Sequence, residues 1–218
     1  MVDRFQLYGY WRSSAAYRVR IALNLKGLEY EQAPVHLARD GGEQHRPEFL
    51  EISPQAQVPV LRHGARLIRQ SLAIIEYLDE LHPDPPLLPA VSRDRARVRA
   101  LAMAVACDIH PLNNLRVVQY LERELGASPE QRTAWMQHWM ALGLAGLEAQ
   151  VADHPSTGDF CEGDTPTMAD CCLVPQLYNA RRYGLDLTPY PTLLRIDAAC
   201  QTLAAFQDAA PEQQPDAG

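Results

Sequence analysis

Apolar and polar positions at the start of the chain follow the pattern of a strand, a turn and a helix. The opening residues carry β-favouring side chains and end at a glycine and a polar run. Residues 15–25 place apolar side chains near helical spacing, with Arg18 and Arg20 on other faces. Ser13 or Ser14 can serve as the N-cap. This stretch predicts a strand that leads directly into the N-terminus of a helix.

The following residues predict three further strands of a small sheet. The ranges predicted as strands are 29–35, 58–62 and 66–69, and those predicted as helices are 47–52 and a segment capped by Ser71. Pro59 occupies the second position of a strand. Because proline cannot donate to the strand ladder, this position must lie at a sheet edge or have an unusual backbone conformation. A strand–helix–strand unit implies a parallel pair, and the hairpin at His63 and Gly64 makes the sheet mixed.

Residues 83–89 contain four prolines, which neither a helix nor a strand interior tolerates. This stretch predicts a linker, with an α/β domain over residues 1–82, the linker over 83–91 and an all-helical domain over 92–218.

The pattern of the second domain is helical throughout. It predicts one long helix from Ser92 to about Tyr120, bent near Pro111. Thr167 and Asp170 form a capping-box pattern at the start of another helix. Further helices are predicted over 129–151, 192–199 and 203–209, and residues 211–218 are expected to be frayed.

Composition narrows the class of protein. The 218 residues are 47% hydrophobic, and the net charge of −7 argues against a general nucleic-acid binder. No apolar run approaches the roughly 18 residues of a membrane span, and the first residues lack a signal-peptide pattern. These features predict a cytoplasmic globular protein that does not bind membranes.

The five cysteines fit neither a disulfide framework nor a zinc site, because their number is odd and no Cys-x-x-Cys is present. The histidines show no metal-ligand spacing either, so no metal is expected. All five cysteines follow residue 100, so none lies at the first helix. This absence disfavours thiol transfer of the glutaredoxin type.

The start of the first helix is a candidate anion site. A strand that leads into a helix N-terminus directs backbone N–H groups and the positive end of the helix dipole at one spot. Ser13, Ser14 and Arg12 lie beside that spot. A thiol that must ionise would be stabilised there, although plain helix capping explains the serines equally well.

Five blocks of sequence, in order, resemble the zeta class of soluble glutathione transferases. They are Arg-Ser-Ser-Ala-Ala-Tyr-Arg-Val-Arg-Ile-Ala-Leu at 12–23, Gln-Val-Pro-Val-Leu at 57–61, Gln-Ser-Leu-Ala-Ile-Ile-Glu-Tyr-Leu at 70–78, Thr-Pro-Thr-Met-Ala-Asp-Cys-Cys-Leu-Val-Pro-Gln at 165–176 and Asp-Leu-Thr-Pro-Tyr-Pro at 186–191. The resemblance covers nearly the whole chain. It implies a thioredoxin-like α/β N-terminal domain followed by an all-α C-terminal domain, and a homodimer.

The resemblance also implies an activity. Members of this class act as maleylacetoacetate isomerases or maleylpyruvate isomerases, which use glutathione as a cofactor for cis–trans isomerisation of a dicarboxylic keto acid. The class signature usually has a cysteine where this chain has Ala15, and the maleylpyruvate branch also lacks it. Arg116 is likewise more typical of that branch. These two residues favour maleylpyruvate slightly, whereas the general signature favours maleylacetoacetate.

Site residues follow from the resemblance, position by position. Ser13 would donate a hydrogen bond to the glutathione sulfur, and Arg12 would act beside it. Other positions implied to contact glutathione are Ser14, Ala15, Gln44, Val58, Pro59, Gln70, Ser71, His110 and Asn114. Pro59 is expected to be cis. Arg12, Arg116 and Arg182 would hold the substrate carboxylates, because a guanidinium binds a carboxylate with two parallel hydrogen bonds.

Each assignment has an alternative. Tyr8 could be the sulfur donor instead of Ser13, although core packing suits it better. Ser71 could be only a helix cap, the arginines only surface residues, and His110 a hydrogen-bonded histidine of a helix.

Two other functions are compatible with the pattern. One is a transferase or dehalogenase on small α-haloacids, which would consume glutathione. The other is a non-catalytic binding protein of the same fold, which would need none of the three arginines.

Overall fold

The computed structural model describes residues 4–217, which divide into two compact units. One unit comprises the chain up to Leu88 together with the segment from Gln201 onward, and the other comprises Pro89–Cys200.

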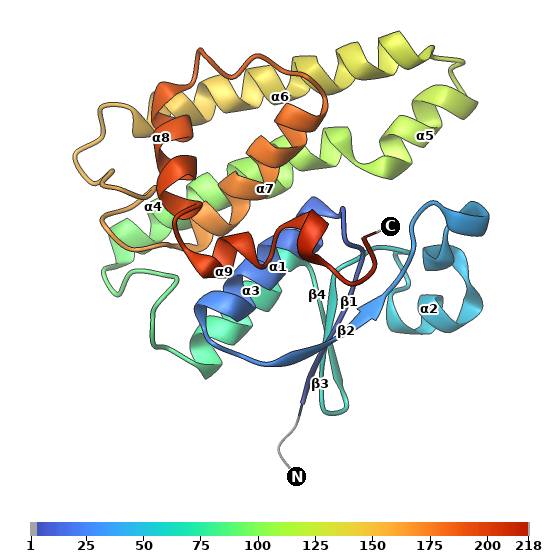
Figure 1. The fold of residues 1–218 in the computed structure, drawn as a ribbon, viewed down its shortest axis with the longest axis horizontal. Coiled ribbons are helices and arrows are strands. Elements are labelled where there is room, and N and C mark those ends of the chain that lie inside the picture. Colours follow the sequence, from blue (N-terminus) through green and yellow to red (C-terminus); the bar gives the residue numbers. More distant parts are fainter. Residues whose placement is uncertain (1–3, 218) are drawn as a thin grey trace. The chain divides into compact units, whose positions relative to one another are not determined.

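The first unit is built on one mixed sheet of four strands in the order β2-β1-β3-β4 (Figure 1). The strands are β1 (Phe5–Gly9), β2 (Tyr30–Pro34), β3 (Val60–His63) and β4 (Arg66–Arg69). β1 is parallel to β2 and antiparallel to β3, and β4 is antiparallel to β3. The predicted combination of a parallel pair and a hairpin is confirmed.

Helices cover both faces of this sheet. Helices α1 (Ser14–Leu25) and α3 (Ser71–Leu81) lie on one face, and the short helix α2 (Pro47–Ile52) lies on the other (Figure 1). On the α2 face, Val35, Phe49 and Val60 form a buried cluster, against which Tyr8 packs. Short 3₁₀ turns η1 (Arg39–Gly41) and η2 (Glu43–His45) lead into α2.

β3 begins two residues later than predicted. Pro59 has no backbone N–H to contribute to a strand ladder, so pairing with β1 starts at Val60, opposite Tyr8. The prediction that Pro59 lies inside the strand is therefore wrong. The expectation that the Val58–Pro59 peptide bond is cis is confirmed.

Helix α1 is buried on all sides over Ala16–Leu23. Arg18 and Arg20, predicted on faces other than the apolar one, are also buried, because they are only 2% and 3% exposed. Arg18 Nη1 donates to Ser71 Oγ at 3.2 Å, and Arg20 Nε donates to the carbonyl of Ala209 at 2.9 Å. Both buried guanidinium groups thus connect α1 to segments distant in the sequence.

The chain from Gln201 onward packs against α1 rather than with the helical unit, unlike the predicted division at 92–218. It contains α9 (Ala204–Gln207) and the 3₁₀ turn η5 (Pro211–Gln213), with α9 beside α1 (Figure 1). The prediction that residues from 211 are frayed is wrong, because Gln214 is 4% exposed. Gly218 lies outside the described residues.

The proline-rich linker is anchored at its start to the first unit. Lys26 Nζ pairs with Asp79 Oδ1 at 2.5 Å and donates to the carbonyls of His82 and Pro85. Asp79 also accepts from the N–H of Leu87 at 2.7 Å. A buried charge needs such partners, so this cluster holds the linker against α1 and α3.

The second unit is helical. Its elements are α4 (Ser92–Met103), the π-helical turn η3 (Ala104–Ile109), the 3₁₀ turn η4 (His110–Asn113), α5 (Leu115–Arg123), α6 (Pro129–Val151), α7 (Met168–Arg182) and α8 (Pro191–Cys200). The prediction of one bent helix from Ser92 to about Tyr120 is wrong. The chain leaves helical geometry at Asn114, where ψ is 147°. Asn114 then caps a new helix, α5.

The predicted capping box at the start of α7 is confirmed. Thr167 Oγ1 accepts from Ala169 N–H, and Asp170 Oδ2 accepts from the backbone N–H of Thr167 at 2.7 Å. Asp170 Oδ1 accepts from Cys161 N–H at 2.9 Å. Burial raises the pKa of Asp170, whereas these hydrogen bonds act in the opposite direction.

Gly143 on α6 permits close approach of the segment that leads to His110. A Cβ at Gly143 would lie 2.2 Å from Ile109 Cγ1, and Ile109 is buried. We expect Gly143→Ala to destabilise the protein by about 1–2 kcal/mol, because overpacking exceeds the gain in helix propensity. Chemical unfolding measures this change.

Gly146 in the same helix is the matched control, because a Cβ there would meet nothing within 4 Å. Gly146→Ala should stabilise the protein by about 0.5–1 kcal/mol. Equal effects at the two glycines would contradict the packing argument.

Candidate active site

Ser13 lies at the turn between β1 and α1. The turn is closed by a hydrogen bond from Ser13 N–H to the carbonyl of Tyr10 at 2.9 Å. Ser13 is the N-cap of α1, and its Oγ accepts from Ala16 N–H at 3.2 Å. A hydroxyl that accepts a hydrogen bond retains its own proton to donate. Capping and donation to a ligand are therefore compatible in this side chain.

The N-terminus of α1 is suited to an anion. Ser14 and Ala15 are its first two residues, whose N–H groups have no acceptor within a helix. The first turn contains no acidic residue, and Ser13–Ala15 are partly exposed. The positive end of the helix dipole is thus accessible, and no carboxylate in the first turn neutralises it.

Arg12 is held beside this turn by aromatic rings. Its guanidinium carbon lies 5.1 Å from the ring centroid of Trp11 and 6.0 Å from that of Tyr10. These distances are within the range of cation–π attraction. Arg12 is partly exposed, so its donors can reach a ligand.

Tyr8 has another environment. Its hydroxyl accepts from Arg62 Nε at 3.1 Å, and its ring lies 6.3 Å from that of Phe49. These contacts account for Tyr8 as a packing residue on the α2 face.

Val58 and Pro59 immediately precede β3, which is paired with β1. Gln70 has a positive φ of 70° and is the N-cap residue of α3, without a side-chain cap bond in the described structure. The prediction that Ser71 caps this helix is wrong. Gln70, with its positive φ, is the N-cap and Ser71 is the first helical residue, so α3 starts one position earlier than a cap at Ser71 would require. The Ser71 hydroxyl instead accepts from Arg18.

Gln44 is 4% exposed. Its Nε2 donates to the carbonyl of Leu37 at 3.4 Å, whereas its buried Oε1 has no hydrogen-bond partner within the described part of the chain. A Cβ at Gly42, where φ is +101°, would lie 2.5 Å from the Gln44 amide. Gly42 therefore permits the position of this amide.

In the second unit, His110 is the first residue of η4 and Asn114 is the N-cap of α5. Asn114 Oδ1 accepts from Arg116 N–H at 3.1 Å. Arg116 is thus the second residue of a capped helix, and its side chain is exposed.

The structure distinguishes the two adjacent arginines at the end of α7. Arg181 Nη2 pairs with Asp197 Oδ2 on α8 at 2.6 Å, so it connects two helices. The guanidinium of Arg182 lies 5.0 Å from the ring centroid of Tyr183, and the residue is exposed. Of the two, Arg182 retains a guanidinium available for a ligand.

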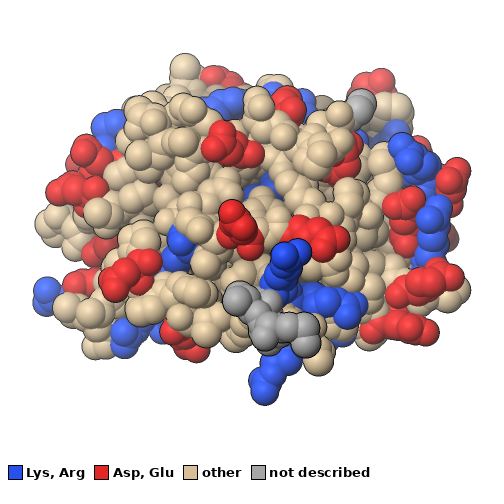
Figure 2. Space-filling view, turned by 60° about the horizontal axis from the view of Figure 1, so that its bottom comes forward, with Lys and Arg blue, Asp and Glu red and all other residues tan. Residues whose placement is uncertain are grey.

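Basic and acidic side chains are interspersed on the face shown in Figure 2. This mixture differs from the continuous basic stripe of a nucleic-acid binder. Over residues 4–217, no helix is long and apolar enough to cross a membrane. Among the same residues, no group of three or more His, Cys, Asp or Glu is placed to hold a metal ion.

Comparison with known proteins identifies the family. The family model for the N-terminal domain of glutathione S-transferase matches residues 7–86, and the one for the C-terminal domain matches residues 116–209. The chain belongs to the glutathione S-transferase family. The predicted fold class, a thioredoxin-like domain followed by an all-α domain, is confirmed by these matches and by the sheet.

Individual relatives are similar over nearly the whole chain. A Vibrio cholerae protein named probable maleylacetoacetate isomerase is 53% identical over 97% of both chains. The solved holo structure of a zeta-class maleyl pyruvate isomerase has a TM-score of 0.95 at 49% identity, covering 98% of this chain and 100% of its own. The resemblance to the zeta class is confirmed.

A third comparison includes a bound ligand. The maleylacetoacetate isomerase of Anaeromyxobacter dehalogenans, solved with dicarboxyethyl glutathione and citrate in its active site, has a TM-score of 0.86. It is 49% identical and covers 99% of this chain and 98% of its own.

Two residues near the candidate site have structural roles that the sequence did not predict. Arg18 supports Ser71, and Asp216 accepts from Trp11 N–H at 2.9 Å. Arg18 gave no clear signal, because its partner Ser71 lies 53 residues away in the chain. Asp216 gave no signal, because it lies in a short polar segment more than 200 residues from its partner.

Proposed function

We propose that this transferase is a glutathione-dependent cis–trans isomerase of maleylacetoacetate or maleylpyruvate. The observation that carries the proposal is the likeness over nearly the whole chain to isomerases of both names. One of them holds a glutathione with a dicarboxyethyl group. Such a group on sulfur is what addition of a thiol across the double bond of a butenedioate produces. The expectation of an isomerase from the sequence motifs agrees with these names.

Glutathione would bind along the first unit. The backbone of Val58, before β3, can pair with the cysteine residue of glutathione as an added strand does. Gln70 and Ser71 at the start of α3 suit the γ-glutamyl carboxylate, and Gln44 suits the glycine end. Ser13 would donate to the sulfur while Ser14 and Ala15 direct N–H groups toward it, which lowers the pKa of the thiol.

The reaction begins when the glutathione thiolate adds to one carbon of the cis double bond. The electron pair of that bond moves onto the conjugated carbonyl oxygen and forms an enolate. The former double bond is now single and rotates. The enolate then reforms the double bond in the trans geometry and expels the thiolate, so glutathione is not consumed.

Arg12, Arg116 and Arg182 would bind the carboxylates and stabilise the charge that develops on the enolate oxygen. His110 and Asn114 would contact glutathione. The substrate class is a dicarboxylic keto acid, for which three guanidinium groups are a suitable complement. We also propose that the protein is a cytoplasmic homodimer. Light scattering after gel filtration determines the number of subunits.

Arg181 and Arg182 allow a matched test of the substrate-binding role. We expect Arg182→Ala to raise KM for the keto acid about tenfold or more, because one charge-assisted contact is lost. The melting temperature should not change. Arg181→Ala should leave KM near the wild-type value and lower the free energy of unfolding by about 1 kcal/mol or less. A larger KM effect at Arg181 would contradict the assignment.

The function itself is tested with purified protein and both substrates, with and without glutathione, by following trans product and total free thiol. Isomerisation that requires glutathione and conserves thiol is the expected result. The ratio of the two rates identifies the preferred substrate. Loss of thiol on an α-haloacid without isomerisation would assign a conjugating transferase instead, and weak glutathione binding without turnover would assign a binding protein.

A further inference from the structure

The C-terminal segment from Gln201 to Ala217 is attached to α1 and to the turn that contains Ser13. Tyr17 and Asn24 of α1 donate side-chain hydrogen bonds to the carbonyls of Phe206 and Ala205. Phe206 and Ala209 are fully buried. This segment is therefore an integral layer of the glutathione-binding unit.

Gln214 fixes the last part of the segment. Its Nε2 donates to the carbonyls of Asp208 and Ala210 at 2.9 and 2.8 Å, and its Oε1 accepts from Gln32 of β2 at 2.9 Å. Gln214 is buried, so these bonds are shielded from water. They place Asp216, two residues later, against the end of β1.

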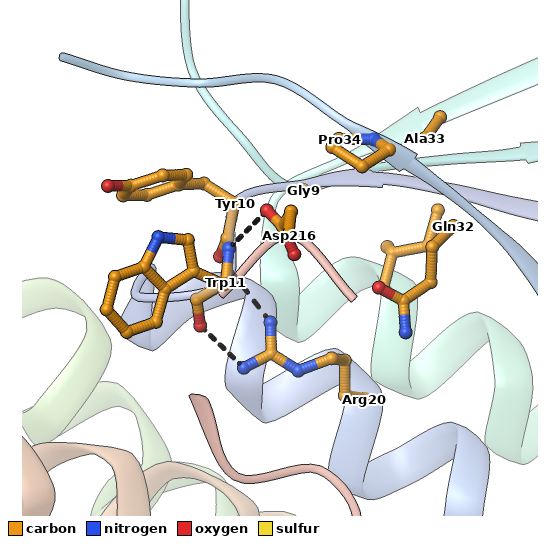
Figure 3. A pocket seen from close by; sticks show the side chains of 9 residues that line it. Gly9, Tyr10, Trp11, Arg20, Gln32, Ala33, Pro34 and Asp216 are labelled. Atoms are coloured by element: carbon orange, nitrogen blue, oxygen red, sulfur yellow. Dashed lines mark hydrogen bonds between the residues drawn. The ribbon is translucent and has the colours of Figure 1, made fainter. Parts of the chain in front are cut away.

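Asp216 binds the peptide unit before Trp11, and Arg20 binds the peptide unit after it. Asp216 Oδ2 accepts from Trp11 N–H at 2.9 Å, and Arg20 Nη2 donates to the Trp11 carbonyl at 2.9 Å (Figure 3). Arg20 Nη1 also lies 3.5 Å from the Tyr10 carbonyl, and its Nε is bonded to Ala209. Hydrogen bonds with an ionised partner are about twice as strong as neutral ones.

These contacts bear on Ser13 through the turn. Trp11 is the second residue of the four-residue turn Tyr10–Ser13, and the N–H of that position has no acceptor inside a β-turn. Asp216 supplies this acceptor. The rotation of the Trp11 peptide helps to determine the backbone of Arg12 and Ser13, and hence the direction of the Ser13 hydroxyl. A donor to a reacting atom must be held to within about 0.5 Å.

We propose that Asp216 is a positioning residue for the Ser13 donor. Its carboxylate, with Arg20, fixes the turn so that the Ser13 hydroxyl and the first N–H groups of α1 converge on the glutathione sulfur. Asp216 itself touches neither glutathione nor substrate in this mechanism. The inference rests on the proposed function, in which Ser13 stabilises the thiolate.

The test uses full-length Asp216→Ala and two readouts. The ultraviolet absorbance of bound thiolate, followed against pH, should shift its midpoint upward by about one pH unit, which is a tenfold weaker stabilisation of the thiolate. The ratio kcat/KM for glutathione should fall about tenfold to a hundredfold, the range expected when a supporting residue is lost. A merely structural role would lower the melting temperature and leave the thiolate midpoint in place.

Asp208→Ala is the matched control. It removes one carboxylate from the same segment, but Asp208 is exposed and its backbone carbonyl, rather than its carboxylate, binds Gln214. We expect wild-type behaviour in both readouts. Asp216→Asn keeps an acceptor oxygen without charge and should be intermediate, about threefold below wild type, since a neutral bond is weaker.

Two results would overturn the inference. In the first, Asp216→Ala has the same thiolate midpoint and the same kcat/KM as Asp208→Ala. In the second, Asp216→Asn has wild-type values in both readouts. This second result decides the question if Asp216→Ala does not fold. If wild-type protein binds glutathione but isomerises neither substrate, the proposed function fails, whereas the thiolate titration still tests the positioning role separately.

Discussion

Replacing Ser13 by alanine is expected to lower kcat for glutathione-dependent isomerisation by about a hundredfold to a thousandfold, as loss of one preorganised donor does in other enzymes. In this structure the Ser13 oxygen accepts from Ala16 N–H, which leaves the hydroxyl proton to be donated. Without that donor, the thiol of bound glutathione keeps a higher pKa. Steady-state turnover and the thiolate titration of bound glutathione measure both consequences.

The same substitution also removes a helix cap, which costs about 1 kcal/mol. Ser128→Ala controls for this cost, because Ser128 caps α6 through its hydroxyl in the same way. Ser13→Thr retains both a hydroxyl and a cap and should recover much of the activity. If Ser13→Ala keeps turnover within a factor of two of Ser128→Ala, another group is the sulfur donor.

The second large effect is on stability. Asp170→Ala is expected to lower the free energy of unfolding by about 3 kcal/mol, since it removes a capping-box partner and leaves buried donors unpaired. Asp170 is fully buried and accepts from Cys161 N–H, Thr167 N–H and Thr167 Oγ1. The carboxylate thus joins the start of α7 to the loop before it. Chemical unfolding measures the loss.

Gln131→Ala is the matched control for Asp170→Ala. Gln131 occupies the same capping-box position in α6, and its side chain accepts from Ser128 N–H at 2.8 Å. That residue is exposed, so water replaces the lost bond and the expected cost is about 0.5–1 kcal/mol. Equal losses at the two positions would mean that burial of Asp170 contributes nothing.

Local features of this protein were predictable because their interactions join residues close in the chain. The Ser13 cap, the capping box of Thr167 and Asp170, and the hairpin at Gly64 each depend on residues within a few positions of one another. The order of strands and helices in the first unit follows from such patterns. The candidate site residues of that unit follow mainly from the family resemblance, and their roles stay predictions.

Interactions between residues distant in the chain produced some of the errors, and unforeseen local backbone conformations produced the others. The apolar spacing of α1 does not reveal that Arg18 and Arg20 are buried, because their partners Ser71 and Ala209 come from α3 and the C-terminal segment. The break at Asn114 was missed because helical periodicity continues across it. Ser71 was assigned as a cap because the positive φ of Gln70 is not visible in its residue type.

The sequence by itself thus determined the order of elements in the first unit, the family motifs and the turn that presents Ser13. Only the tertiary structure decided which charged side chains are buried and that the polar segment ending near Asp216 belongs to the first unit. The physical reason is that a hydrogen bond between residues 11 and 216 has no periodicity or spacing to mark it in the sequence. Its partners meet only after the sheet and α1 have formed the surface on which the segment packs.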